Sequence, residues 1–223
     1  MHELELVIFD MAGTTVQDGG QVPQAFTSAL AAHGLEVTPE QLRQVRGASK
    51  RQAVLHFIPD GPERVAMAER VYSTFREHLA EAYQKSGVSA IAGTEQTFAW
   101  LRARGIRIAL NTGFDREITA LLLEALGWGQ DTADAVICGD DVPQGRPAPY
   151  LIFRALETTG TYSLRRVANV GDTALDLQAG HHAGVRWNIG VLSGAHDHAT
   201  LSAAPHTHLL TSVAELPQLW QTE

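Results

Sequence analysis

The stretch "VIFDMAGTT" (7–15) joins an apolar run to a single carboxylate, Asp10, and then to a short segment of small residues. Amphipathic stretches such as "REITALLLEALG" (116–127) separate similar apolar runs later in the chain. These runs have strand length, are bounded by turn residues and lie at 4–9, 106–110, 135–138 and 167–170 and, more weakly, at 184–191 and 206–210. Strands that alternate with helices at this spacing predict an α/β fold, a Rossmann-like doubly wound parallel sheet.

The segment between the first and second strands breaks this rhythm. It carries apolar residues at three- and four-residue spacing in four successive stretches and shows no strand pattern. Pro39 and Pro62 stand where a first helical residue is expected. Four helices are too many for one crossover between neighbouring strands. We therefore expect residues 18–87 to form a separate all-helical insertion, and residues 1–17 and 88–223 to form the sheet domain.

Composition and charge exclude several classes of function. The 223 residues are 44% hydrophobic and carry a formal net charge of −8, which disfavours binding to nucleic acid or to anionic lipid. No apolar run approaches the ~20 residues of a membrane span, and the N-terminal residues show no signal-peptide pattern. Cys138, the only cysteine, reads as a buried strand residue. We expect a soluble cytoplasmic protein, and whether it forms a homodimer is left open.

Polar residues follow three of the predicted strands. Asp10, Thr112 with Gly113, and Asp172 each end an apolar run. Each residue alone is explained by a helix cap or a turn. Because ligands bind at the carboxyl ends of strands in an open parallel sheet, the three together predict a site at this edge.

The residue types at this edge suit phosphoryl transfer. Asp10 could attack phosphorus, and Asp10 with Asp172 could hold Mg²⁺, a hard cation that prefers oxygen ligands. The backbone N–H groups and hydroxyls of residues 13–15 (Gly13, Thr14 and Thr15) and 112–113 could cradle a dianion. Arg146 precedes Pro147, a possible helix start, and could hold phosphate oxygens there. Asp176, four residues after Asp172, could orient the metal or its water.

Four segments in this order resemble the motifs of the haloacid dehalogenase superfamily: "DMAGTT" (10–15), "NTG" (111–113), "GRPAP" (145–149) and "GDTALD" (171–176). The helical insertion is similar to that superfamily's C1-type cap. The resemblance implies a hydrolase that forms an aspartyl-enzyme intermediate on Asp10. It also implies Mg²⁺ on Asp10, the Ala12 carbonyl and Asp172 with support from Asp176, and phosphate contacts from Thr112 and Arg146.

Ala12 stands where most phosphatases of the superfamily carry a second aspartate, which serves as general acid and base. Such catalysis is worth ~10²–10⁴-fold, and an alanine side chain cannot supply it. The first motif and Arg146 resemble those of the phosphonatase subfamily, in which the leaving group is carbon and a cap lysine forms a Schiff base. The matching segment here is "RGASK" (46–50), with Lys50 in the lysine position.

The lysine content gives a separate indication for Lys50. The chain has two lysines, Lys50 and Lys85, against fifteen arginines, and an amine nucleophile is one role that arginine cannot fill. The chain departs from the phosphonatase pattern at Arg46, Ala53 and Phe114, where that subfamily has methionine, histidine and tyrosine. Arg46 places a second cation beside Lys50, which either favours its free amine form or binds a second anionic group of the substrate.

The motif residues and the helical insertion suggest three alternative functions. The first is a Mg²⁺-dependent phosphonatase-like hydrolase that cleaves a small phosphonate such as phosphonoacetaldehyde. The second is a phosphatase of a small phosphate monoester, in which Lys50 and Arg46 only bind substrate. The third is a phospho-accepting domain similar to a response-regulator receiver, which the length and the insertion disfavour. The paired histidines His196 and His198 lack a thiolate partner and read as loop or surface residues.

Overall fold

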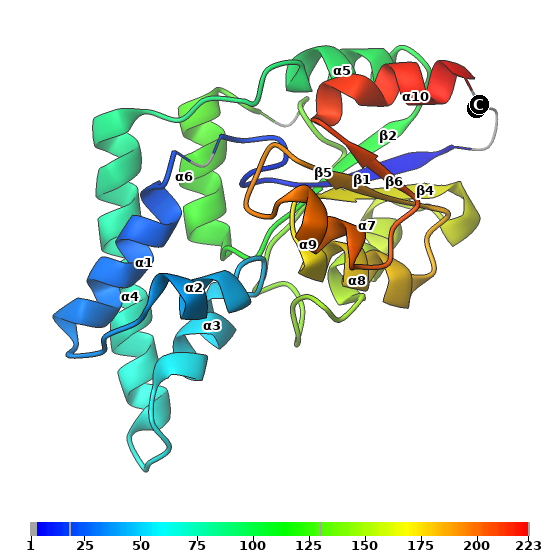
Figure 1. Ribbon diagram of the computed structural model, residues 1–223. Coiled ribbons are helices and arrows are strands. Elements are labelled where there is room, and N and C mark those ends of the chain that lie inside the picture. Colours follow the sequence, from blue (N-terminus) through cyan, green and yellow to red (C-terminus); the bar gives the residue numbers. More distant parts are fainter. Residues whose placement is uncertain (1–3, 18, 130, 223) are drawn as a thin grey trace.

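The computed structural model describes residues 4–17, 19–129 and 131–222. It shows a six-stranded parallel sheet in the order β3-β2-β1-β4-β5-β6, with helices on both faces (Figure 1). The strands are β1 (Leu6–Asp10), β2 (Arg107–Asn111), β3 (Ala135–Ile137), β4 (Val167–Gly171), β5 (Trp187–Val191) and β6 (His208–Leu210). Every apolar run that was expected to form a strand does so, and the doubly wound α/β fold is confirmed.

Alternating side chains of β1 pack against the two layers of helices. Val7 and Phe9 belong to an apolar cluster with the helices on one face, and the Phe9 ring meets that of Phe98 edge to face at 5.2 Å. Leu6 and Ile8 face the opposite layer. Because successive side chains of a strand point to opposite faces, a strand buried on both faces is a continuous apolar run.

The helices fall into two layers about the sheet. On the Phe9 face lie α5 (Thr94–Arg102), α6 (Arg116–Leu126) and α10 (Leu216–Thr222), the last preceded by the 3-10 turn η2 (Val213–Glu215). On the other face lie α7 (Tyr150–Thr159) and α8 (Ala174–Ala183). The short helix α9 (His198–Ser202) follows β5, and η1 (Leu164–Arg166) leads into β4.

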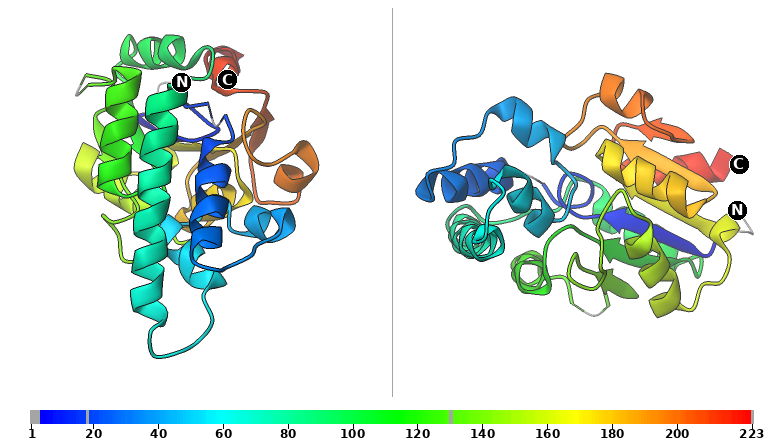
Figure 2. Two further views of the ribbon diagram at one scale, coloured as in Figure 1. Left: turned by 90° about the vertical axis from the view of Figure 1, so that its left-hand side faces the viewer. Right: turned by 90° about the horizontal axis from the view of Figure 1, so that it is seen from below.

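The helical insertion stands together to one side of the sheet (Figures 1 and 2). Its helices are α1 (Gln21–Ala32), α2 (Pro39–Gln44), α3 (Lys50–Phe57) and α4 (Arg64–Ser86). The rings of Phe26 and Phe75 meet edge to face at 5.6 Å between α1 and α4. The apolar cluster of the insertion is continuous with that on the Phe9 face of the sheet. Its separation as a domain stays a prediction, and Asp18, where the predicted insertion begins, lies outside the described residues.

A helix was expected to begin at each of three prolines, and it does so at one of them. Pro39 begins α2, and Thr38 caps it by accepting the N–H of Gln41. The expectation at Pro62 was wrong, since α4 begins two residues later at Arg64. The expectation at Pro147 was also wrong, because α7 begins at Tyr150. No helix of the described chain is both long enough and apolar enough to cross a bilayer.

Candidate active site

The centre of the sheet brings the predicted strand-end residues to one place. Asp10 ends β1, and its register partner on β2 is Asn111, which precedes Thr112. On the other side of β1 lies β4, which ends at Gly171 and is followed by Asp172. The strand order reverses between β1 and β4, and a ligand crevice is expected at such a switch point.

A buried ion-pair network surrounds Asp10. One guanidinium nitrogen of Arg146, Nη1, lies 2.7 Å from Asp10 Oδ1 and 2.9 Å from Asp176 Oδ1. Nη2 of the same group donates to the Asn111 side chain. Burial alone would lower the pKa of Arg146, but Asp176 and Asp10 raise it above its ordinary value. Arg146 therefore stays cationic and holds Asp10 in place.

One expectation about the sheet edge is corrected here, and the supporting role of Asp176 toward a metal stays a prediction. Arg146 is not placed at a helix start, because α7 begins four residues later. Asp176 sits in the first turn of α8, where it accepts the N–H of Thr173 at 3.0 Å and pairs with Arg146. Its contact is with the arginine, so any effect it has on a metal would pass through Arg146 and the field of the site.

Asp172 lies close enough to Asp10 for their charges to interact, and within the described parts of the chain no basic side chain forms an ion pair with it. Its carboxylate accepts the Thr14 hydroxyl at 3.1 Å and the Ala195 N–H at 2.6 Å. Burial raises the pKa of Asp172, and the nearby charges of Asp10 and Asp176 raise it further. Burial likewise raises the pKa of Asp10 to about 6, with Arg146 opposing and Asp176 adding to the rise. Two buried carboxylates whose pKa values are both raised form a place where a cation would be stabilised.

The donor set at this place fits Mg²⁺. Within residues 4–17, 19–129 and 131–222, no three acidic, histidine or cysteine side chains cluster as a metal site by themselves. A cation here would rely on the carboxylates of Asp10 and Asp172, completed by a carbonyl oxygen and water. Mg²⁺ commonly keeps several waters and takes only one or two carboxylates from a protein.

The turn after β1 packs closely against Asp172. Gly13 has φ 93°, and a Cβ there would lie 2.4 Å from Asp172 Oδ2. Its N–H donates to the Val16 carbonyl, and the Thr14 N–H donates to that of Met11. Neither Gly13 nor Thr14 lines the cavity described below. Their N–H groups close the turn and the Thr14 hydroxyl donates to Asp172, and the expected contact of Gly13 and Thr14 with a phosphate stays a prediction.

The loop of residues 45–49, between α2 and α3, packs directly on the sheet edge. The N–H of Lys50, the first residue of α3, donates to the Gly113 carbonyl at 3.2 Å. A Cβ on Gly113 would lie 2.7 Å from the Ala48 carbonyl oxygen, and one on Gly47 would lie 2.4 Å from the Thr173 hydroxyl. Glycines on both sides thus allow the helical insertion and the sheet edge to meet backbone to backbone.

The Lys50 side chain lies at this junction. Its Nζ is 3.4 Å from the Ala48 carbonyl oxygen and 5.5 Å from the centroid of the Phe114 ring. Thr112 lines the same junction, where its hydroxyl accepts the Phe114 N–H at 3.1 Å. The lysine from the insertion and the loop after β2 therefore face one another.

A cavity of about 80 Å³ lies between the sheet edge and the helical insertion. This is smaller than the roughly 300–1,000 Å³ of pockets for drug-sized ligands, so it suits a small metabolite. Its polar and glycine lining includes predicted site residues from both parts of the chain: Asp10, Arg46, Lys50, Thr112, Gly113, Arg146 and Asp172, together with Ala12. Its apolar wall includes Val22, Pro23, Phe26, Leu42 and Val45 of the insertion.

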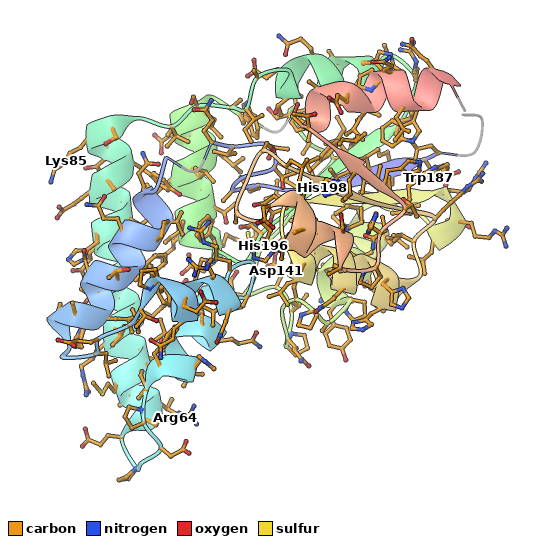
Figure 3. The ribbon with its side chains drawn as sticks, in the orientation of Figure 1. Arg64, Lys85, Asp141, Trp187, His196 and His198 are labelled. Atoms are coloured by element: carbon orange, nitrogen blue, oxygen red, sulfur yellow. The ribbon has the colours of Figure 1, made fainter. Side chains whose placement is uncertain are left out.

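Some site residues were missed from the sequence. Asn111 binds Arg146, and the loop after β5 supplies the Ala195 N–H to Asp172. His196 in that loop is half-buried, accepts the Ala174 N–H at 3.0 Å and also hydrogen-bonds the backbone of Arg43. It therefore joins α8 to α2 and is not a simple surface residue (Figure 3). Ligands bind at the carboxyl ends of parallel strands, and the same rule applied to β5 would have pointed to this loop.

Two other predictions about single residues held. His198 is exposed on α9 (Figure 3). Cys138 is fully buried just after β3, and burial raises the pKa of its thiol to about 11. A thiol in that state is not a nucleophile at neutral pH.

Comparisons with known proteins agree with this geometry. A profile of the haloacid dehalogenase-like hydrolase family matches residues 7–189. A phosphonoacetaldehyde hydrolase of Bacillus cereus is 32% identical over 206 residues, covering 86% of this chain and 77% of that protein. One from Bacteroides fragilis is 34% identical over 235 residues, covering 98% and 89%.

Solved structures show the same fold. A hydrolase from Pseudomonas syringae superposes with a TM-score of 0.86 at 21% identity, over 98% of both chains. A phosphonoacetaldehyde hydrolase like protein from Oleispira antarctica superposes with a TM-score of 0.85 at 23% identity, over 99% of this chain and 92% of the other. The chain therefore belongs to the haloacid dehalogenase-like hydrolases, is a hydrolase, and resembles the phosphonatases within that family.

Proposed function

We propose that this protein cleaves the carbon–phosphorus bond of a small carbonyl phosphonate such as phosphonoacetaldehyde, with Asp10 as nucleophile and Lys50 as the imine-forming amine. The observation that carries the proposal is that Asp10 of the sheet edge and Lys50 of the helical insertion line one small cavity. Ala12 lines it too, at the position where an oxygen leaving group would need an acid. The relatives named phosphonoacetaldehyde hydrolase also support the cleavage of a carbon–phosphorus bond.

Mg²⁺ would be held by Asp10, Asp172 and the Ala12 carbonyl. Once bound, it would offset the charge of the two carboxylates and of the phosphoryl oxygens. Arg146 keeps the Asp10 carboxylate fixed through the 2.7 Å ion pair, so the nucleophile needs little reorganisation to attack. Thr112 and Arg146, which also line the cavity, are the side chains that would contact the phosphoryl group.

The bond changes balance as follows. The Lys50 amine adds to the carbonyl carbon and one water leaves, which gives a protonated imine. The electron pair of the C–P bond moves into the imine to form an enamine, while the phosphoryl group forms a bond to an Asp10 oxygen. Protonation of the enamine carbon and hydrolysis by one water release the aldehyde and regenerate the amine. A second water cleaves the aspartyl phosphate, so the net reaction consumes one water.

Hydrolysis of a small phosphate monoester is the alternative that uses the same core residues. It requires a proton for the leaving oxygen, and Ala12 cannot supply one. Among the described residues that line the cavity, the carboxylates are those of Asp10 and Asp172, which already have the roles of nucleophile and metal ligand. This arrangement favours a carbon leaving group stabilised by an imine.

The test is Mg²⁺-dependent phosphate release from phosphonoacetaldehyde, measured beside a panel of small phosphate monoesters. We expect release from the phosphonate to be preferred in the natural protein. Lys50→Arg should keep the fold and Mg²⁺ binding and lose C–P cleavage, because a guanidinium cannot form the imine.

Lys85→Arg is the matched control. Lys85 is exposed, pairs with Glu81 and points outward from α4 (Figure 3). It should leave the activity unchanged. Full activity of Lys50→Arg toward the phosphonate would refute the imine role of Lys50, and turnover of monoesters alone would assign the protein to the alternative.

A further inference from the structure

Arg46 occupies an unusual position in the cavity wall. It is half-buried and lines the cavity in the 45–49 loop, four residues before Lys50. Among the residues that the structure describes, its guanidinium makes no ion pair. Its neighbours in the insertion do: Arg43 pairs with Glu40, and Arg51 pairs with Glu69. Arg46 is thus a half-buried cation in the cavity lining, with no ion-pair partner among the described residues.

The two sides of the cavity carry opposite charge. Asp10 and Asp172 lie on the sheet edge, with Arg146 compensating Asp10. The insertion side carries Arg46 and Lys50 on an otherwise apolar wall. A guanidinium that a ligand buries against an apolar wall is costly unless an anion pairs with it. Since the carboxylates in the cavity are committed to the sheet edge, the anion that fits Arg46 belongs to a ligand.

That anion cannot be the phosphoryl group of the proposed reaction. In-line attack by Asp10 requires phosphorus to lie at the sheet edge, beside Asp10 and Arg146. The second anionic group therefore sits at the other end of the substrate, next to the carbon that Lys50 attacks. A guanidinium binds a carboxylate through two parallel hydrogen bonds, which makes carboxylate the group that Arg46 recognises best.

We propose that the substrate is a small phosphonate whose carbonyl carbon carries a carboxylate, that is, a 2-oxo acid with phosphorus on the adjacent carbon. This inference rests on the proposed function, because it takes Lys50 as the amine that attacks the carbonyl. The same bond changes apply: the C–P electrons enter the imine, phosphorus passes to Asp10, and two waters release a 2-oxo acid and phosphate. The buried Ala53, which also lines this wall, leaves room for the added group.

The kinetic test compares kcat/KM for 3-phosphonopyruvate and phosphonoacetaldehyde. We expect the natural protein to prefer 3-phosphonopyruvate by about tenfold or more, as a charge-assisted bidentate contact implies. Arg46→Met should remove that preference while phosphonoacetaldehyde turnover persists, and Arg46→Lys should restore part of it. Arg43→Met is the matched control, since Arg43 is exposed and lies outside the cavity lining.

A binding arm separates failure of this inference from failure of the proposed function. With Mg²⁺ present, 3-phosphonopropionate and propylphosphonate differ by one carboxylate and undergo no C–P cleavage through an imine. Calorimetry should show at least about tenfold tighter binding of the carboxylate-bearing probe to the natural protein and equal binding of both to Arg46→Met.

Three outcomes decide the matter. A substrate preference that Arg46→Met abolishes supports the inference. Turnover of phosphonoacetaldehyde with no preference, or an equal loss of both substrates in Arg46→Met, overturns the inference and keeps the proposed function. If neither phosphonate is cleaved, the proposed function fails, and the binding arm alone decides whether Arg46 recognises a carboxylate.

Discussion

The two walls of the cavity differ in how their charges are compensated. At the sheet edge, the side chains of Arg146, Asp10 and Asp176 are 3%, 8% and 3% exposed and satisfy one another. In the helical insertion, the Arg51–Glu69 pair is 45% and 54% exposed and lies outside the cavity lining. The network of Arg146, Asp10 and Asp176 is therefore a closed electrostatic unit, whereas the insertion brings Arg46 to the cavity lining, where it forms no ion pair with the described residues.

This difference suggests that the sheet edge carries out the reaction and that the insertion selects the substrate. A buried, mutually paired network fixes a nucleophile to within a narrow geometry and changes little with the ligand. We expect a wall of apolar residues with two cations to decide which small anion binds in the cavity.

Removing Arg146 should damage the molecule most. Arg146→Met leaves Asp10 and Asp176 buried without their cation, and breaking a buried pair in this way costs about 3–5 kcal/mol. We expect a loss of that order in the free energy of unfolding, measured by urea denaturation at neutral pH. The loss should shrink in acid, where the carboxylates become protonated. A stability equal to that of the natural protein would show that the network is not the closed unit described above.

Gly113→Ala should break the contact between the two walls. Its Cβ would lie 2.7 Å from the Ala48 carbonyl oxygen, and neither backbone can yield without moving the 45–49 loop. A displacement of about 1 Å at a reacting group can cost on the order of 100-fold in rate. We expect kcat/KM to fall by about 10–100-fold with a smaller change in stability. An unchanged rate would mean that the junction at Gly113 has no part in positioning Lys50.

The pH dependence of stability should report the paired carboxylates. In the metal-free protein the pKa of Asp10 is raised from 3.8 to about 6, chiefly by burial, so the folded form binds its proton more tightly than the unfolded form. This contribution to stability is complete below the unfolded pKa and is lost as the pH rises through about 6. The pKa of Asp172 shifts in the same direction.

The metal should reverse this trend. Because Mg²⁺ and protons compete for the same oxygens, the increase in Tm that Mg²⁺ produces should grow as the pH rises from about 5 to about 7. Asp172→Asn should reduce the increase at every pH. A Mg²⁺ effect that is independent of both pH and Asp172 would place the metal elsewhere.

The exposed pair should matter least. Arg51→Met removes the ion pair with Glu69, and exposed pairs contribute about 0–1 kcal/mol. We expect a change in the free energy of unfolding within that range, measured under the conditions used for Arg146→Met. A loss as large as that of Arg146→Met would remove the contrast between the two walls.

Much of the fold and part of the site were accessible from the sequence. The strands are continuous apolar runs because both faces of the sheet are covered, and Asp10 and Asp172 followed from the rule that ligands bind at strand ends. The partners of Arg146 did not follow, because a contact between residues 146, 10 and 176 depends on where three chain segments meet. Nor did the internal use of the Gly13 and Thr14 N–H groups by the turn follow from the sequence, and their phosphate role stays a prediction.

For the helical insertion, the sequence could suggest candidate site residues but not their positions in the structure. The resemblance of "RGASK" (46–50) to the phosphonatase cap segment and the scarcity of lysine pointed to Lys50, and the structure places it in the lining of the same cavity as Asp10. His196 escaped because its two hydrogen-bond partners come from α8 and α2, which no local pattern brings together.

Reductive trapping of the imine tests directly whether Lys50 forms a Schiff base with the substrate. The protein is incubated with phosphonoacetaldehyde and Mg²⁺, reduced with borohydride, digested and sequenced by mass spectrometry. We expect a substrate-derived adduct on Lys50, none on Lys85, and none on any residue in Lys50→Arg. Phosphate release from phosphonoacetaldehyde without an adduct on Lys50, or with Lys85 labelled equally, would contradict it.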